Sequence, residues 1–141
     1  LRMCSRNGIR RKTHHMEERK KILLIIEDDA TLSRALKDAF AIPGLDVLMA
    51  SDGIMGLEMA TTRHPDLILL DIVLPKMSGI EMLKKLRQDP WGKDAKVIIL
   101  TNLSEQEKIA DALESDAYEY FVKVEWELPA LVKKIRVLLG L

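Results

Sequence analysis

Short apolar segments alternate with helix-length segments from residue 21 onward, and this alternation limits the possible folds more than any other feature. Four segments have the pattern of buried strands: KILLII, DLILL, KVIIL and YEYFV. The first is a continuous apolar run, which indicates a strand buried on both faces, as in a parallel sheet. The intervening segments predict helices covering both faces of that sheet. Right-handed crossovers then favour an α/β fold with a doubly wound, five-stranded parallel sheet.

The expected elements follow one another in strict alternation. The strands are expected at Lys21–Ile26, Asp46–Ala50, Asp66–Leu70, Lys96–Leu100 and Glu119–Val122. The helices are expected at Thr31–Phe40, Gly53–Thr62, Ile80–Arg87, Glu105–Glu114 and Pro129–Leu139. In the second helix we expect Ile54 and Leu57 to face the core, with Met55 as a third candidate.

Length, charge, cysteine content and the length of the apolar runs argue against several classes of protein. The 141 residues suit one domain with a substantial core. Residues 1–15 hold five basic residues and no acid, so the rest carries 17 basic and 22 acidic side chains, a net charge of −5. That balance argues against DNA binding within this chain. Cys4 is the only cysteine, which excludes an internal disulfide and a thiolate metal cluster. No apolar run approaches the ~18 residues of a membrane span, and we expect a cytoplasmic protein that does not contact the membrane.

Residues 1–20 differ in composition from the rest of the chain. They are polar and basic, without helical or strand periodicity. We interpret them as a disordered extension or one derived from an expression vector, and residues 21–141 as the folded domain. The alternative is a basic arm that touches acidic lipid or nucleic acid.

Acidic residues follow two of the predicted strands. Glu27 and Asp28 come after the first strand and Asp71 after the third, and parallel strands bring such ends to one edge, where α/β sheets place their ligands. Asp28 and Asp29 have a simpler explanation as N-caps of the following helix, which suits Asp29 better. Clustered carboxylates repel one another unless a cation is present. Mg²⁺ suits such a cluster because it prefers oxygen ligands and needs only one or two carboxylates from the protein.

Asp71 is the candidate nucleophile for phosphoryl transfer. A carboxylate can attack a phosphoryl group and form an aspartyl phosphate. Thr101 and Lys123 follow the fourth and fifth strands, where a hydroxyl can donate to a phosphoryl oxygen and an ammonium can balance its charge. Taken singly, Thr101 is better explained as a β-branched strand residue and Lys123 as a solvated lysine. Only their occurrence together with the acidic residues, each just past a strand, favours phosphoryl transfer.

The motifs IIEDD, LILLDIVLPKMSGIEML, VIILTN and AYEYFVK resemble those of response regulator receiver domains in two-component systems, of the single-domain CheY-like type, over residues 21–141. The resemblance implies a flavodoxin-like (βα)5 fold with strand order 2-1-3-4-5. It implies these roles for individual residues: Mg²⁺ binding by Glu27, Asp28, Asp71 and the main-chain carbonyl of Val73, phosphoacceptor Asp71, switch residues Thr101 and Tyr120, and phosphate contact by Lys123.

The function implied by the resemblance is Mg²⁺-dependent acceptance of a phosphoryl group on Asp71 from a histidine kinase or a phosphotransfer protein. Such a domain is not an enzyme beyond self-phosphorylation and self-dephosphorylation. Phosphorylation would reshape the surface of the last two helices and the strand between them for a downstream protein partner or a homodimer. Lys133, Lys134 and Arg136, beside Leu131 and Ile135, form either that partner surface or a solvated helix face.

Several residues depart from the family pattern. Val124 replaces the usual proline after Lys123, and Asn102 replaces a small residue after Thr101. A receiver-like docking module without phosphoryl turnover therefore stays open as an alternative. Apolar Val73 and Leu103 at positions that tune dephosphorylation predict slow loss of the phosphoryl group.

Two classes of protein outside this family fit the sequence less well. A flavodoxin-like cofactor site would place a phosphate against Glu27, Asp28 and Asp29, which would repel it. An aspartyl-phosphate hydrolase would carry its nucleophile after the first strand, whereas Asp71 follows the third.

Overall fold

The computed structural model describes residues 19–101, 119–122 and 128–141, with the side chains of residue 101 and residues 119–122 outside that description. The extension over residues 1–18 and the helix expected at Glu105–Glu114 lie outside the described residues. Arg19 and Lys20, at the end of the predicted extension, form exposed ion pairs with Asp66 (3.4 Å) and Asp46 (3.6 Å).

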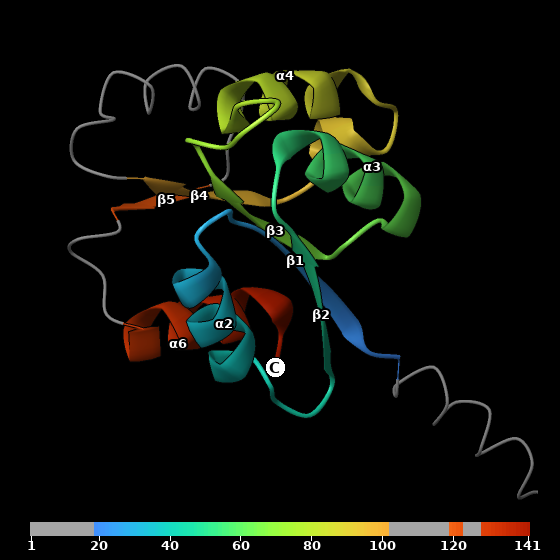
Figure 1. Ribbon diagram of the computed structural model, residues 1–141. Coiled ribbons are helices and arrows are strands. Elements are labelled where there is room, and N and C mark those ends of the chain that lie inside the picture. Colours follow the sequence, from blue (N-terminus) through green and yellow to red (C-terminus); the bar gives the residue numbers. More distant parts are fainter. Residues whose placement is uncertain (1–18, 102–118, 123–127) are drawn as a thin grey trace, which may run out of the picture.

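A single five-stranded parallel sheet organises the fold (Figure 1). Its strands are β1 (Lys21–Ile26), β2 (Leu45–Ala50), β3 (Leu67–Asp71), β4 (Val97–Thr101) and β5 (Glu119–Val122). Their order across the sheet is β2-β1-β3-β4-β5, and each neighbouring pair is parallel. This order confirms the doubly wound, flavodoxin-like α/β fold expected from the sequence.

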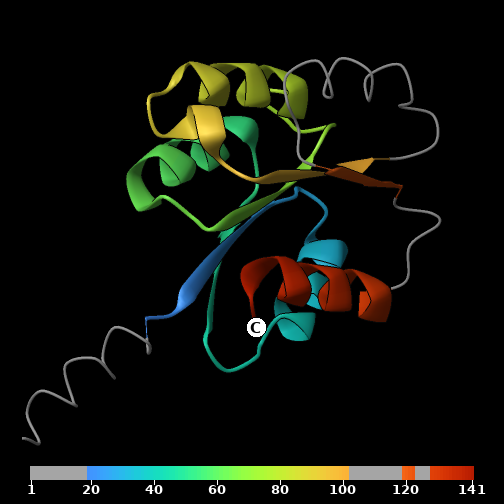
Figure 2. The same ribbon diagram turned by 180° about the vertical axis from the view of Figure 1, so that it is seen from behind.

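Helices cover both faces of the sheet. The described helices are α2 (Ala30–Ala39), α3 (Gly53–Arg63), α4 (Gly79–Gln88) and α6 (Leu128–Leu139), with a short 3₁₀ turn, η1, at Gly92–Asp94 that the sequence did not predict. Figures 1 and 2 show α3 and α4 together on one face and α2 and α6 together on the other. None of the helices in the described ranges is long and apolar enough to cross a membrane.

Alternate residues of each central strand enter opposite cores. In β1, Leu24 and Ile26 pack in the core under α3 and α4, whereas Leu23 and Ile25 pack in the core under α2 and α6. All four are fully buried. This two-sided burial explains the unbroken apolar run of β1, because successive side chains of a strand point to opposite faces.

The core face of α3 differs from the prediction. Ile54 is 52% exposed and Met55 is 41% exposed, whereas Leu57 is half-buried. The buried residues of α3 are small, namely Gly53, Gly56 and Ala60. A Cβ atom on Gly56 would overlap the Ile26 side chain, so the helix lies too close to the sheet for larger residues. The prediction for Ile54 and Met55 was wrong because apolar periodicity does not reveal such a close approach.

The boundaries of β1 and β5 match the prediction, and each of the other predicted elements that the structure describes differs by one residue at one end or at both. Asp71 and Thr101 are the last residues of β3 and β4 rather than the first residues after them. The main chain at Asp71 pairs with Leu100 of β4, so the strand continues through the carboxylate-bearing residue.

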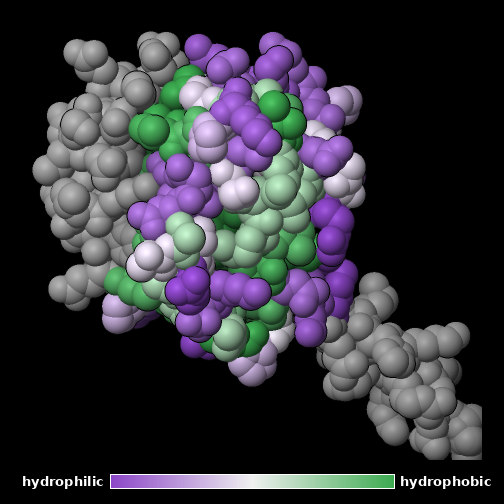
Figure 3. Space-filling model, viewed as in Figure 1, coloured by the Kyte–Doolittle hydropathy of each residue, from purple (hydrophilic) through white to green (hydrophobic). Residues whose placement is uncertain are grey.

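The apolar part of the partner surface predicted on α6 is not present at Leu131 and Ile135. Leu131 and Ile135 are fully buried in the core against α2, so they cannot form an apolar partner surface. Lys133, Lys134 and Arg136 are exposed. An exposed apolar side chain of α6 is Val137. In the view of Figure 3, hydrophobic surface also lies between the two helix layers, with hydrophilic side chains on either side.

Candidate functional site

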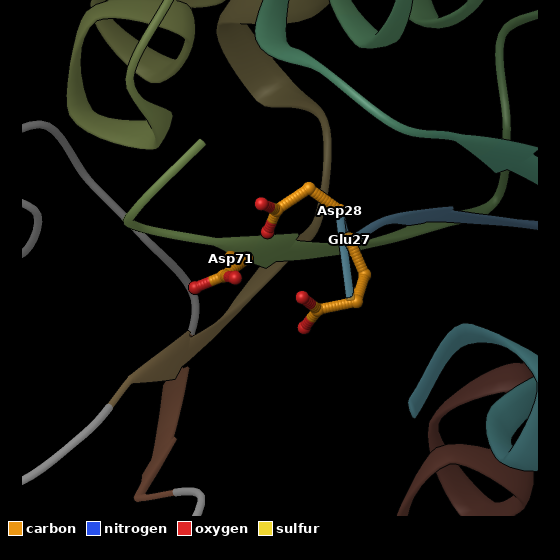
Figure 4. Close-up of side chains that lie close together, drawn as sticks. All are labelled: Glu27, Asp28 and Asp71. Atoms are coloured by element: carbon orange, nitrogen blue, oxygen red, sulfur yellow. The ribbon is translucent and has the colours of Figure 1, made fainter. Parts of the chain in front are cut away.

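Three carboxylates gather at the carboxyl edge of the sheet. Glu27 and Asp28 follow β1, and Asp71 ends β3, the neighbouring strand. Figure 4 shows their side chains close together. One carboxylate oxygen from each lies within 4.8 Å of the other two. The structure therefore brings together the three acidic side chains that the sequence singled out, because adjacent parallel strands end at the same edge.

Glu27 is buried and accepts hydrogen bonds from two residues at the start of α2. Its side chain is almost completely buried, with 2% of the residue exposed. One carboxylate oxygen accepts a hydrogen bond from the Asp29 main-chain N–H at 3.1 Å, and the Ser33 hydroxyl donates to the Glu27 carbonyl at 3.1 Å. These contacts tie Glu27 to the start of α2 through both its carboxylate and its main-chain carbonyl.

Asp28 and Asp29 separate into two roles. Asp29 is the N-cap of α2, and its carboxylate accepts from the N–H groups of Thr31 and Leu32 at 2.9 and 3.1 Å. Asp28 is exposed and belongs to the carboxylate cluster instead. The capping explanation thus holds for Asp29, whose carboxylate satisfies N–H groups that the first helical turn leaves open.

Asp71 is buried at the mouth of the sheet, with 4% of the residue exposed. One of its oxygens accepts from the Val73 N–H at 3.2 Å. The chain then returns close behind it, since Gly79 N–H donates to the Ile72 carbonyl at 2.8 Å and a Cβ on Gly79 would overlap the Asp71 carbonyl. The glycine that follows the LPKMS segment is therefore required for α4 to start against the phosphoacceptor candidate.

The remaining predicted site residues are described in part. Thr101 ends β4 beside β3, and its main chain pairs with Val122 of β5. Tyr120 lies in β5, paired with Ile99. Their side chains, and all of Lys123, lie outside the described residues.

A groove of about 520 Å³ opens beside the carboxylates. It runs from Glu27 and Asp28 along α2 and the end of β2, where Met49 and Ala50 supply apolar lining and Arg34 and Lys37 supply positive charge. Asp71 does not line this groove, so the groove adjoins only two of the three carboxylates.

The donor set fits a hard divalent cation. Carboxylate oxygens are the ligands that Mg²⁺ prefers, and it keeps several waters in addition to one or two protein carboxylates. Two of the three acids are buried, and like charges this close destabilise one another without a cation. The site combines two buried carboxylates with one exposed carboxylate at the carboxyl edge of the sheet.

The fold and the site together define an α/β domain of flavodoxin-like topology with an acidic pocket at the carboxyl edge of its sheet. The family model for the response regulator receiver domain matches residues 23–136. The chain belongs to this family. Receiver domains are signalling domains rather than enzymes in the usual sense.

Named relatives include the DNA-binding dual master transcriptional regulator RpaA of Synechocystis sp., 34% identical over 117 residues, which cover 83% of this chain and 48% of that protein. The transcriptional regulatory protein DltR of Streptococcus agalactiae is 37% identical over 114 residues, covering 81% of this chain and 50% of that protein. The chain therefore spans about half the length of these curated relatives.

Solved structures show the same architecture. A CheY-like response regulator receiver domain protein from Methanospirillum hungatei is 28% identical with a TM-score of 0.76, covering 86% of this chain and 94% of that one. The receiver domain of sensor histidine kinase PA1611 from Pseudomonas aeruginosa has a TM-score of 0.76 at 22% identity, covering 86% of this chain and 99% of that one. That structure has a magnesium ion coordinated in its active-site cleft.

Asp52 is a residue near this region that sequence reasoning missed. It is buried, with 7% of the residue exposed, and its carboxylate accepts from the Met55 N–H at 2.7 Å as the N-cap of α3. An aspartate before a glycine at a predicted helix start is a recognisable capping signal. Its burial is visible only in the structure.

Proposed function

We propose that this receiver domain accepts a phosphoryl group on Asp71 from the phosphohistidine of a histidine kinase or phosphotransfer protein, in a Mg²⁺-dependent reaction. One observation carries the proposal: a buried aspartate at the carboxyl end of β3 lies within 4.8 Å of two further carboxylates. Membership of the receiver family supports the same chemistry.

Glu27, Asp28 and Asp71, with the main-chain carbonyl of Val73, would hold the metal. Bound there, Mg²⁺ would supply positive charge that offsets the negative charge of the phosphoryl group. An oxygen of Asp71 forms the new bond to phosphorus while the bond between phosphorus and the donor's imidazole nitrogen breaks, and the donor leaves as neutral histidine after taking up a proton. The protein's part is mainly to position the groups and balance their charge.

Two further residues complete the proposed site. Thr101, at the end of β4, donates its hydroxyl to a phosphoryl oxygen, and Lys123, directly after β5, contributes a positive charge. These roles rest on the family resemblance together with the strand positions.

Phosphorylation then acts as a switch. Thr101 moves toward the phosphoryl group and Tyr120 packs behind it, which shifts the population toward an active state. The output is a changed surface over the segment Glu105–Glu114, β5 and α6 that binds a downstream protein or a second copy of the domain. We place the protein in the cytoplasm, with no DNA or membrane contact through this domain.

The test is intact mass spectrometry after incubation with a small acyl phosphate and Mg²⁺. The native chain should gain one phosphoryl group, and Asp71→Asn should gain none. Asp38→Asn, an exposed aspartate on α2, is the matched control and should behave as the native chain. An adduct on Asp71→Asn equal to that on the native chain would refute the assignment of the phosphoacceptor.

The alternative is a receiver-like docking module without phosphoryl turnover, which Val124 and Asn102 keep open. Absence of an adduct from both the small donor and a cognate kinase, with folded protein and an active donor, would support it.

A further inference from the structure

Asp52 is the third buried acidic residue among those whose burial the structure describes, together with Glu27 and Asp71. The proposed chemistry uses the other two but not Asp52. One oxygen of its carboxylate caps α3 through the Met55 N–H at 2.7 Å. The other lies 3.6 Å from the ammonium nitrogen of Lys76, which belongs to the loop between β3 and α4. Asp52 therefore links the start of α3 to the loop that follows the phosphoacceptor candidate.

The main chain at Lys76 is strained. Its φ of +68° lies in the left-handed region, and the Met77 N–H donates to the Pro75 carbonyl at 2.7 Å, which closes a tight three-residue turn of the γ type. Side chains other than glycine adopt this conformation at a cost, so it persists only where other contacts hold it. The ion pair to Asp52 is such a contact.

The two loops also meet through their main chains. A Cβ atom on Gly53, next to Asp52, would overlap the Met77 carbonyl. At its other end the same loop is fixed beside Asp71 by the hydrogen bond from Gly79 to Ile72. Val73 lies between these anchors, and its N–H donates to the Asp71 carboxylate at 3.2 Å. Movement of the loop at Lys76 would therefore reach the main chain of Val73.

We propose that Asp52 and Lys76 are positioning residues: their ion pair holds the β3–α4 loop so that the main chain of Val73 meets the metal and the phosphoryl group at Asp71. This inference rests on the proposed function. Neither side chain touches the reacting atoms. Lys76 is 66% exposed at its side chain, so its removal leaves the core intact.

A positioning role and a purely electrostatic role of Lys76 predict opposite changes in the Mg²⁺ affinity of Lys76→Met. If Lys76 acted only through its charge, Lys76→Met would tighten Mg²⁺ binding, because a repelling cation is removed. If the ion pair positions the loop, Lys76→Met and Asp52→Asn both weaken Mg²⁺ binding. The double variant is then no weaker than either single variant, since each breaks the same contact.

The experiment is calorimetric titration of the full chain with Mg²⁺, for the native protein and the variants Lys76→Met, Lys76→Arg, Asp52→Asn and the Asp52→Asn/Lys76→Met double. Asparagine is retained as a helix cap, so α3 keeps its start. We expect about two- to fivefold weaker binding for Lys76→Met and Asp52→Asn, as for a partly exposed ion pair. Lys76→Arg should stay near the native affinity. Lys84→Met, which removes an exposed charge on α4, should not change it.

The titration results distinguish failure of the positioning inference from failure of the proposed function. The inference would be overturned if Lys76→Met bound Mg²⁺ as tightly as the native chain or more tightly, or if the losses added in the double variant. In that case, Mg²⁺ binding by the native chain would leave the proposed function standing. No Mg²⁺ binding by the native chain would overturn both. Thermal unfolding without Mg²⁺ identifies any variant whose loss comes from a damaged fold.

Discussion

Without Mg²⁺, a variant that lacks the Asp28 charge should be more stable than the native chain. With Mg²⁺ bound, it should be less stable than the native chain. Asp28 is the exposed member of the carboxylate cluster, so Asp28→Asn changes charge with little change in packing. Its carboxylate lies within 4.8 Å of the Glu27 and Asp71 carboxylates, where each repulsion amounts to about 0.9 kcal/mol in a water-like dielectric and about 3.5 kcal/mol at an effective dielectric constant of 20.

The lower of these two repulsion energies applies to an exposed carboxylate such as Asp28, and salt reduces it further. Part of the repulsion with Glu27 persists in the unfolded chain, because the two residues are adjacent in sequence. We therefore expect Asp28→Asn to raise the free energy of unfolding by about 1 kcal/mol without Mg²⁺, equivalent to a rise in Tm of roughly 2 to 5 °C. At a Mg²⁺ concentration 100-fold above Kd, the native chain gains about 2.7 kcal/mol, whereas the variant lacks one metal ligand and gains less. The order of stability should reverse.

The assay is urea unfolding followed by circular dichroism, with and without Mg²⁺ at matched ionic strength. Asp38→Asn on α2 is the control and should follow the native chain in both conditions. An Asp28→Asn protein that is less stable than the native chain without Mg²⁺, or that gains the same stability from Mg²⁺, would refute the reasoning.

Three other perturbations test the local geometry. Gly79→Ala should destabilise the fold and weaken Mg²⁺ binding, because the added Cβ overlaps the Asp71 carbonyl; native Mg²⁺ affinity in calorimetry would contradict this. Asp29→Ala should cost about 1 kcal/mol in urea unfolding through loss of the α2 cap, whereas Asp29→Ser should keep most of the stability. The phosphorylated protein should lose its phosphoryl group slowly, because the exposed Val73 side chain cannot orient a water; a half-life of seconds by intact mass would refute this prediction.

Much of the fold was predictable because it depends on local pattern. The apolar run of β1 and the alternation of strand and helix segments predicted a doubly wound parallel sheet, and its observed order confirms it. The core face of α3 was not predictable, since Gly53 and Gly56 face inward only because the helix lies very close to Ile26 and Met77. The burial of Leu131 and Ile135 in α6 likewise depends on which face meets α2.

For the candidate site, the sequence by itself determined which carboxylates meet. Glu27 and Asp28 follow β1 and Asp71 ends β3, and the topology that follows from the strand pattern brings the ends of these adjacent parallel strands to one edge. Only the tertiary structure decided that Glu27 and Asp71 are buried while Asp28 is exposed, and that Asp52 reaches across to Lys76. Burial and contacts between loops arise from how the helices pack on the sheet, and the spacing of residues along the chain carries no record of that packing.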